Sequence, residues 1–495
     1  MKDVLIIGAS ISGLSAALAF QAKGFKVTVI ESDSAPNSDI TPADAWSWRR
    51  RGVAHAMQPH FFLSGLRNYL ADLYPGLLKD FIEAGVEQIS LSQCIHSSAA
   101  HRYKAKDNDA DLTFFAARRS AFELVMYRYV ERQENIQLLP DVRVKELLFD
   151  GTRAPFTVKA CLAASAGEIK RYDADYVVDA SGRTTNLIKP ICQAGAIVDD
   201  FTYKSKSAYY TRHYRLLPGQ EAPEFIGMPS AMFDDIVVVT FIADNRNFVI
   251  SIVVNQDDPL LYGNSMSDTT VFEEIVRRIP KASRWIESSR AEPTSSVIAW
   301  ANMDFFWRSL VSAEQPQILG YFPVGDTMVR SNPKFGRGCT WAVMGSHILA
   351  ESIAAGGDVS EMTLRYERSI NQYFRSDWEV MLQVDKDDQM RFERAVGLRR
   401  RTLLSGLYAK FTGLTSNVAV SVDPELYREV VRGFYGLTSP TAWLKKPSNW
   451  FRILKSVFMP SESKRLAIAY SKRPSRSEME RIINNCRASV NVGEL

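Results

Sequence analysis

The chain begins with Val4-Leu5-Ile6-Ile7-Gly8-Ala9-Ser10-Ile11-Ser12-Gly13, a short apolar run that leads into a turn with two glycines. A continuous apolar run of this length is typical of a strand buried on both faces of a parallel sheet. Residues 14–20 are small or apolar and predict a helix that lies close to the sheet, ending near Gly24. Residues 26–30 (Lys-Val-Thr-Val-Ile) predict the next strand. These pieces form a βαβ unit, which indicates an α/β protein.

The turn has the spacing G-x-S-x-x-G, with a serine in place of the middle glycine of the dinucleotide-binding pattern. The free N–H groups and the positive dipole end of the following helix suit a pyrophosphate. Glu31 stands 18 residues after Gly13, where a carboxylate can accept hydrogen bonds from a ribose. We therefore expect dinucleotide contacts at Gly8, Ser10, Ile11, Ser12, Gly13, Glu31 and Ser32. The alternatives are a buried turn without a ligand and, if a ligand binds, NAD instead of FAD.

The length of 495 residues suggests two to four domains. Hydrophobic residues make up 46% and charged residues 23%, as in soluble globular proteins, which excludes a disordered, collagenous or coiled-coil chain. The five cysteines are scattered and no pair has C-x-x-C spacing, so we expect neither a disulfide framework nor a metal site. A reducing compartment fits this cysteine usage.

The N-terminus lacks the pattern of a secretory signal, and the longest apolar runs have only strand length. The sequence predicts a cytoplasmic protein, either free or associated with a membrane surface. Residues 391–495 carry a charge balance of +11, which leaves −7 on the rest of the chain. Such a basic tail can bind nucleic acid or an anionic membrane, or it can simply form solvated helix faces. Because no nucleic-acid-binding motif is present, we do not expect a nucleic-acid partner.

Later motifs give the chain a resemblance to a known family. The segments that carry it are 119–123 (Arg-Ser-Ala-Phe-Glu), 177–183 (Val-Val-Asp-Ala-Ser-Gly-Arg), 209–215 (Tyr-Tyr-Thr-Arg-His-Tyr-Arg), Gly325-Asp326 and 333–338 (Pro-Lys-Phe-Gly-Arg-Gly). Together with the N-terminal turn they resemble the FAD-dependent monooxygenases of the p-hydroxybenzoate hydroxylase superfamily. Within that superfamily the chain is most similar to the epoxidases of polyether and polyketide biosynthesis.

This resemblance implies a Rossmann-like FAD-binding domain of the GR2 type, a β-sheet substrate domain and a C-terminal helical region. It assigns Arg119 to the phosphates or the ribityl chain, Asp326 to a ribityl hydroxyl, and Val144 to the adenine. Further flavin contacts are expected at Gly182, Pro333, Gly336 and Gly338. In the family, reduced FAD and O2 form a C4a-hydroperoxide that supplies one oxygen atom. We therefore expect no catalytic side chain, although His60 lies in a loosely family-like stretch.

The turn at 180–182 departs from the family, which has Ala-Asp-Gly where this chain has Ala-Ser-Gly. The family links that aspartate to FAD placement and to NAD(P)H docking. The replacement by Ser181 leaves two routes for reduction of the flavin. NAD(P)H reduces it directly, or a separate flavin reductase does so.

The motifs also suggest domain boundaries. We assign 1–85, 116–195 and 315–360 to a discontinuous FAD-binding domain, 86–115 and 196–314 to a β-rich substrate domain, and 361–495 to the helical region. The β-rich part is expected to cover the flavin and to hold a small hydrophobic, natural-product-like substrate. Candidates for its pocket lining are Tyr209, Tyr210, Arg212, Trp300, Phe305 and Phe306, with Tyr210, Arg212 and Trp300 as the predicted substrate contacts.

Three alternative functions stay open. A flavin-dependent halogenase has the same fold, but Trp46-Ser47-Trp48 stands outside the W-x-W-x-I-P context of that class, and Lys79 reads as part of a solvated helix face. A double-bond reductase resembling geranylgeranyl reductase shares the Asp-Ala-Ser-Gly-Arg turn. A flavin-binding sensor or electron-transfer protein is the non-enzymatic alternative. Residues 449–458 form a basic amphipathic stretch, with aromatics expected inward and Arg452 and Lys455 outward, on the protein or on a membrane.

Overall fold

A five-stranded parallel sheet forms the N-terminal layer of the molecule. The computed structural model describes residues 2–53, 55–183, 186–228, 230–400, 402–403, 406–407, 411, 415–458 and 461–492. The strand order is β22-β10-β1-β2-β6. The bounds are β1 Asp3–Ile7, β2 Lys26–Ile30, β6 Ile136–Leu139, β10 Tyr176–Asp179 and β22 Tyr321–Pro323. The central strands β1 and β10 are fully apolar apart from their ends, as expected for a strand covered on both faces.

Helices cover this sheet on one face and small residues let them approach closely. Helix α1 (Ile11–Ala22) is buried over Ile11 and Gly13–Phe20, and it packs beside α9 (Gly338–Ala354) and α4 (Arg119–Glu131). The predicted helix at 14–20 and the strands on either side of it are thus confirmed. The other helices on this face are α2 (Ser64–Leu73) and α3 (Pro75–Glu83), whereas α5 (Lys189–Gln193) packs on the opposite face of the sheet.

A small sheet covers the other side of this layer and is antiparallel except for its parallel edge strand at 318–319. Its strands are β7 (Arg143–Asp150), β8 (Phe156–Ser165), β9 (Glu168–Asp173) and β21 (Ile318–Leu319). A second group, β3 (Pro59–Phe62), β5 (Phe114–Arg118) and β4 (Glu87–Ile89), joins the N-terminal layer to the rest of the molecule. A third group is β11 (Asp199–Lys204), β18 (Asp304–Ser309) and β23 (Val329–Arg330).

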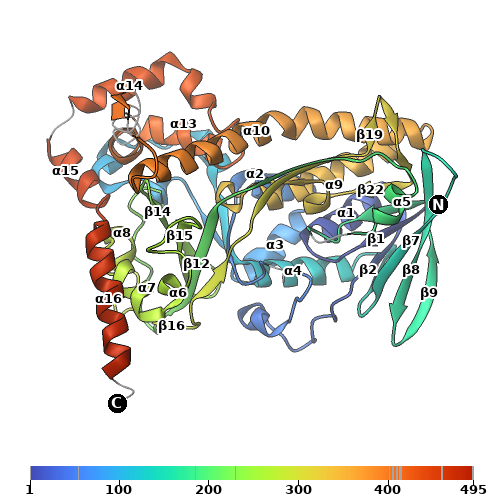
Figure 1. Ribbon diagram of the computed structural model, residues 1–495, viewed down its shortest axis with the longest axis horizontal. Helices are drawn as coiled ribbons and strands as arrows, with labels where there is room; N and C mark the ends of the chain where they lie inside the picture. The colour runs from blue at the N-terminus through green and yellow to red at the C-terminus, as the bar shows by residue number, and fades with distance from the viewer. Residues whose placement is uncertain are drawn as a thin grey trace.

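The second large layer is a six-stranded antiparallel sheet with the order β13-β14-β15-β12-β16, in which β17 also pairs with β12. Figure 1 shows it in green beside the blue N-terminal layer. One face packs on α7 (Thr269–Val276) in a common apolar core. The other face borders the functional cavity described below. The bounds are β12 Ser207–Leu216, β13 Ser230–Met232, β14 Ile236–Ile242, β15 Asn247–Asn255, β16 Ala291–Pro293 and β17 Ile298–Trp300.

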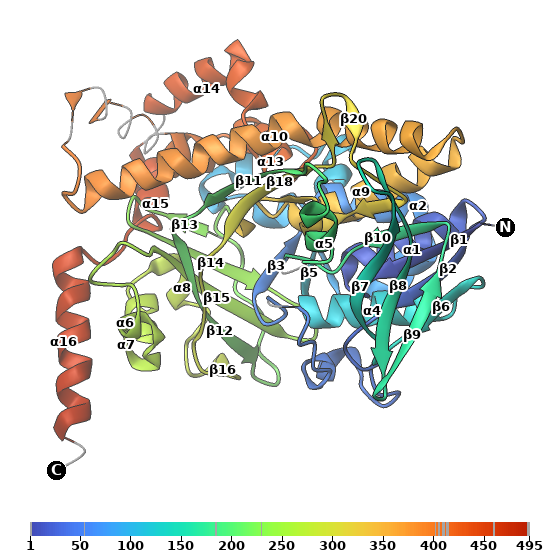
Figure 2. The same cartoon turned by 45° about the vertical axis from the view of Figure 1, so that its right-hand side comes forward.

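Helices make up most of the C-terminal third. The long helix α10 (Val359–Ala395) begins with a capping box between Asp358 and Glu361 and runs along both layers (Figures 1 and 2). Beyond it lie α12 (Val420–Val422), α13 (Pro424–Phe434), α14 (Pro447–Val457), α15 (Ser461–Ala469) and α16 (Arg476–Val492). Within the described ranges, no helix is both long enough and apolar enough to cross a membrane. The predicted α/β architecture with a helical C-terminal region is confirmed, whereas the domain boundaries stay a prediction.

Candidate functional site

A single cavity of about 1120 Å³ opens at the carboxyl ends of β1, β2 and β10 and continues over the antiparallel sheet. Ligands of open α/β sheets bind at this edge, because helix N-termini and loops converge there. The cavity wall includes most of the predicted flavin contacts: Gly8, Ser10, Ile11, Ser12, Glu31, Ser32, Arg119, Val144, Gly182, Asp326, Pro333, Gly336 and Gly338. The N-terminal turn and the segment at 333–338 therefore face one space, although more than 300 residues separate them.

The glycine turn is shaped by two close approaches of the backbone. Gly8 has φ +102°, and a Cβ there would lie 2.7 Å from the carbonyl oxygen of Ala180. A Cβ on Gly13 would lie 1.8 Å from the carbonyl oxygen of Gly8. Gly13 does not line the cavity, so its role is to let α1 lie against β1. No described side chain caps the N-terminus of α1, which leaves its first N–H groups for a ligand.

A buried arginine holds the carboxylate at the end of β2. Glu31 accepts a 2.8 Å hydrogen bond from the backbone N–H of Ala9 and a 3.0 Å bond from Arg50 Nη2. Arg50 also contacts Asp33 and Glu123, and its guanidinium lies 4.4 Å from the centre of the Trp48 ring. The sequence argument missed Arg50, whose one signal is its place in the run Arg49-Arg50-Arg51. Its charge offsets the buried carboxylates beside the predicted ribose site.

Arg119 is buried and forms a network with Ser10 and Glu123 under the glycine turn. Its Nη2 donates to Ser10 Oγ at 3.0 Å and lies 2.7 Å from Glu123 Oε1, while Ser10 Oγ donates to the same carboxylate at 2.6 Å. Burial alone would raise the pKa of Glu123, but Arg119 and Arg50 hold it below its ordinary value. The serine that replaces the middle glycine is thus used to anchor the turn on α4.

A second helix N-terminus faces the cavity next to Asp326. Helix α9 starts at Gly338 without a described side-chain cap, and Gly336 before it has φ +66°. Burial raises the pKa of the Asp326 carboxyl, although Arg330 and Arg119 oppose the shift. This carboxyl is therefore costly to bury alone and suits a hydroxyl-bearing ligand. At the neighbouring turn, Ser181 Oγ donates to Asp179 instead of offering a carboxylate to the cavity.

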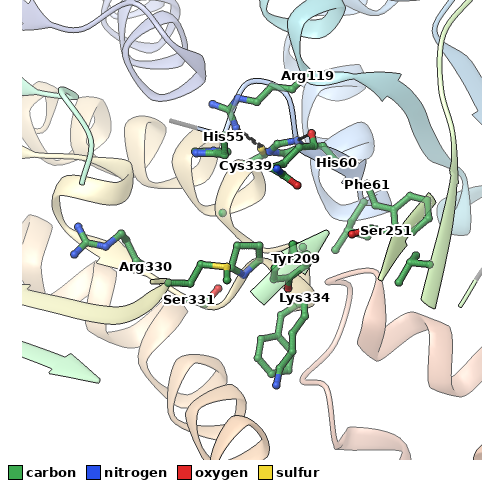
Figure 3. A pocket seen from close by; sticks show the side chains of 18 of the residues that line it. His55, His60, Phe61, Arg119, Tyr209, Ser251, Arg330, Ser331, Lys334 and Cys339 are labelled. Atoms are coloured by element: carbon green, nitrogen blue, oxygen red, sulfur yellow. Dashed lines mark hydrogen bonds between the residues drawn. The ribbon is translucent and has the colours of Figure 1, made fainter. Parts of the chain in front are cut away.

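Two histidines and a tryptophan form a stack in the cavity wall. Figure 3 shows the two histidines, His55 and His60, below Arg119. The ring of His55 lies 5.3 Å from that of His60 and 5.3 Å from that of Trp300. His60 donates from Nδ1 to the carbonyl of Gln58, and its Nε2 accepts from Arg119. Burial and Arg119 lower the pKa of His60 to about 3, so it stays neutral with both nitrogens engaged. His55 Nδ1 is buried and has no partner among the described residues.

A row of side chains across the antiparallel sheet forms the floor of the cavity beyond the flavin contacts. Paired strand positions place Trp300 beside Tyr209, Tyr209 beside Val253, Val253 beside Val237, and Val237 beside Met232. All five line the cavity. Tyr209 also donates to Asn332 Oδ1 at 3.0 Å, which ties this sheet to the segment at 333–338.

The prediction that Tyr210 and Arg212 contact the substrate is wrong, because neither side chain lines the cavity. Successive side chains of a strand point to opposite faces, and Tyr209 occupies the cavity face. The Tyr210 hydroxyl accepts from the N–H of Gly263, and Arg212 pairs with Glu273 of α7. Trp300 lines the cavity as expected, while the aromatic pair Phe305 and Phe306 is buried outside the cavity wall.

The C-terminal helices contribute the opposite wall. Arg337, from the segment at 333–338, donates to the carbonyl oxygens of Gly433 and Phe434 at the end of α13. This contact fixes α13 next to the flavin contacts. The lining residues of this wall include Tyr427, Val430, Phe434, Trp443, Trp450 and Tyr470. The helical region is thus part of the site, which its position in the sequence did not indicate.

Residues 3–177 match the family model described as FAD dependent oxidoreductase. The glycine turn, the two uncapped helix N-termini and the half-buried Asp326 fit FAD. Because the match includes the turn and β2, it supports FAD over NAD as the cofactor of this domain.

Several solved structures with a similar fold are flavoenzymes. The myxobacterial chondrochloren halogenase CndH is 15% identical with a TM-score of 0.58, covering 94% of this chain and 98% of that chain. The flavin-dependent brominase Bmp2 is 16% identical with a TM-score of 0.55, covering 91% and 99%. The probable FAD-dependent monooxygenase pqsL from Pseudomonas aeruginosa is 15% identical with a TM-score of 0.53, covering 79% and 98%. At these identities the likeness concerns the fold, and it confirms the predicted fold class. No curated protein is significantly similar to this chain in sequence.

Proposed function

We propose that this FAD-dependent oxidoreductase is a monooxygenase that transfers one oxygen atom of O2 to a hydrophobic substrate, by epoxidation of an alkene or by hydroxylation. One observation carries the proposal: the dinucleotide contacts and a long apolar chamber belong to the same cavity. A substrate on the chamber floor can thus reach the flavin without crossing water. Bound FAD would supply the activation of O2, which no side chain can provide.

The chain's own residues would bind the FAD, orient the substrate and exclude water from the site. The glycine turn and Arg119 hold the phosphate end, and Asp326 accepts from the ribityl chain. The N-terminus of α9 places its N–H groups and positive dipole end where negative charge develops on a reduced flavin. His55 and Trp300 stack on each other in the wall of the same cavity. The imidazole of His55 stays neutral, because burial holds its pKa well below the ordinary value.

The test is oxygen transfer in a single turnover. The purified protein is loaded with FAD, reduced with dithionite without air, and mixed with labelled ¹⁸O2 and 1-dodecene. We expect 1,2-epoxydodecane or a dodecenol with one labelled oxygen, detected by mass spectrometry. Hydrogen peroxide as the sole product with 1-dodecene and with a set of longer and branched alkenes would contradict the proposal.

The electron donor is tested in the same system. Because Ser181 bonds to Asp179 and presents no carboxylate at the turn, we propose that a separate flavin reductase supplies reduced FAD. NAD(P)H with free FAD should give slow oxygen transfer that an added flavin reductase accelerates. Rapid reduction of the protein-bound flavin by NAD(P)H alone would instead support direct reduction.

Halogenation is the second candidate, favoured by the fold shared with a halogenase and a brominase. Lys79 gives it no support, since this lysine pairs with Glu83 on the exposed face of α3. The two functions differ in their need for halide. Adding bromide to the single-turnover reaction should leave oxygen transfer unchanged, whereas a halogenase would brominate a trap such as monochlorodimedone. A saturated product formed without O2 would indicate a double-bond reductase.

We also propose that α14 rests on an anionic membrane surface. The expectation that the aromatics of this stretch point inward is wrong for Phe451 and Phe458, which are 69% and 87% exposed; the neighbouring Leu454 is 62% exposed. The exposed lysines Lys445 and Lys455 flank these side chains. Apolar side chains surrounded by cations fit an anionic lipid surface. Because Trp450 of the same helix also lines the cavity, a lipophilic substrate could enter from that surface.

A further inference from the structure

A lysine lies at the far end of the cavity without an acidic partner. Lys281 belongs to α8 (Pro280–Ser283) and lines the cavity next to Met228 and Ser230. Its ammonium donates to the carbonyl oxygens of Met228 at 3.3 Å and of Ser230 at 3.1 Å. An ammonium has three N–H groups, so one is left for a further acceptor. Among the described residues, no carboxylate forms an ion pair with Lys281.

The other lysine of the cavity wall, Lys334, does have acidic partners. Lys334 lies 2.6 Å from a carboxylate oxygen of Asp385 and 2.7 Å from one of Asp388. Its charge is therefore neutralised within the protein. Burial lowers the pKa of Lys281 to about 8, which leaves it mostly protonated at neutral pH. The charge of Lys281 acts in turn on His96, whose pKa is lowered to about 4 by burial and by Lys281.

The position of Lys281 fits one end of a long ligand. Its two carbonyl partners flank the start of β13, the edge strand of the sheet. From β13 to Tyr209 on β12 there are three strand spacings, or about 14 Å. The floor between these points is mostly apolar, with Val237 and Val253 at its centre and Ser251 beside them. A bound molecule would lie on this floor between the lysine and the flavin contacts.

We propose that Lys281 binds the carboxylate of an amphiphilic acid whose apolar chain lies across β13, β14 and β15 toward the flavin. The pairing would supply the missing counter-charge, since removing even part of a cation from water is costly unless it is paired. A carboxylate fits better than a phosphate, because a single remaining N–H group cannot satisfy three charged oxygens. This proposal rests on the proposed function, to which it adds the substrate class: a long-chain acid oxidised near its other end.

Binding of two probes of equal length tests it. Dodecanoate and 1-dodecanol are titrated into the FAD-loaded protein and followed by calorimetry. We expect the acid to bind at least tenfold more tightly than the alcohol. Lys281→Met should abolish this difference by weakening the acid alone, and Lys281→Arg should restore part of it. Lys159→Met, an exposed lysine on β8, is the control and should behave as the wild type.

Three results would overturn the proposal: equal affinity of the wild type for acid and alcohol, no binding of either, or an acid preference that survives in Lys281→Met. Melting temperatures of each variant establish that it is folded. The flavin content is measured on the same samples. A protein that does not bind FAD contradicts the proposed function, whereas a loss of the acid preference alone contradicts only the assignment of Lys281.

Discussion

The guanidinium of Arg119 donates a 3.0 Å hydrogen bond to the hydroxyl of Ser10, the residue that replaces the middle glycine of the nucleotide-binding turn. The same hydroxyl donates to Glu123 one turn further along α4. A glycine at this position would leave both charged groups short of one partner. The replacement thus strengthens the support of the turn while the backbone keeps its shape.

Ser10→Ala should lower the melting temperature of the protein, because a buried hydrogen bond to a charged group contributes about 1.5–3 kcal/mol. The Ser15 hydroxyl is the matched control. It lies on α1, the helix that follows Ser10, is buried, and has no partner among the described residues. Ser15→Ala should leave the melting temperature unchanged or raise it. Equal destabilisation by the two variants would contradict the role of the Ser10 hydroxyl.

Glu123→Gln should destabilise the folded protein more strongly than Ser10→Ala does. We expect a loss of about 3–5 kcal/mol at neutral pH, because the change leaves two buried arginines without their shared carboxylate. The folded pKa of Glu123 lies below the unfolded value of about 4.3, so its contribution is present above that pH and is lost as the pH falls. The difference in melting temperature between wild type and variant should therefore shrink from pH 5 to pH 3. The exposed pair Glu83–Lys79 supplies the control, since Glu83→Gln should cost at most about 0.5 kcal/mol.

Asp326→Asn should separate stability from flavin binding. Burial raises the folded pKa of this carboxyl, so its ionised form destabilises the protein at neutral pH and the amide should raise the melting temperature of the FAD-free protein. The affinity for FAD should fall at least tenfold, as measured by flavin fluorescence. Asp173→Asn, on the exposed strand β9, should change neither quantity. Unchanged FAD affinity in Asp326→Asn would exclude the ribityl contact.

Two neighbouring valines test which face of the antiparallel sheet holds the substrate. Val237→Phe should keep the melting temperature but weaken dodecanoate binding, because the added ring fills the cavity floor. Val238 is 2% exposed on the opposite face. Val238→Phe should therefore overpack the core at a cost of about 1–3 kcal/mol and change ligand affinity little. Reversed effects would mean that the cavity lies on the other face.

Flotation with liposomes tests the membrane contact of α14. The wild type should float with vesicles that contain phosphatidylserine and remain behind with neutral vesicles. The double change Phe451→Ser and Leu454→Ser should abolish flotation, while its melting temperature stays the same. Ile169→Ser removes an apolar side chain of similar exposure (65%) from the distant strand β9, and it should float as the wild type does. Flotation that survives the double change would exclude α14 as the contact.

The sequence by itself determined the parts of the protein that local patterns encode. The apolar strand, the two glycines and the small-residue helix specified the βαβ unit, because each piece depends on neighbours in the chain. The later motifs, including Asp326 and Gly338, pointed to the flavin contacts that the cavity brings together.

Only the tertiary structure decided which face of β12 meets the cavity and which distant groups complete the wall. Alternation along the strand gave no signal, because one face borders the cavity, the other packs on α7, and both are buried. The roles of Arg50 and Lys281 could not be predicted from periodicity either, since a loop and a four-residue helix carry no periodic pattern. Their roles arise from long-range packing, which sets what a side chain faces, whereas local sequence sets only the element it belongs to.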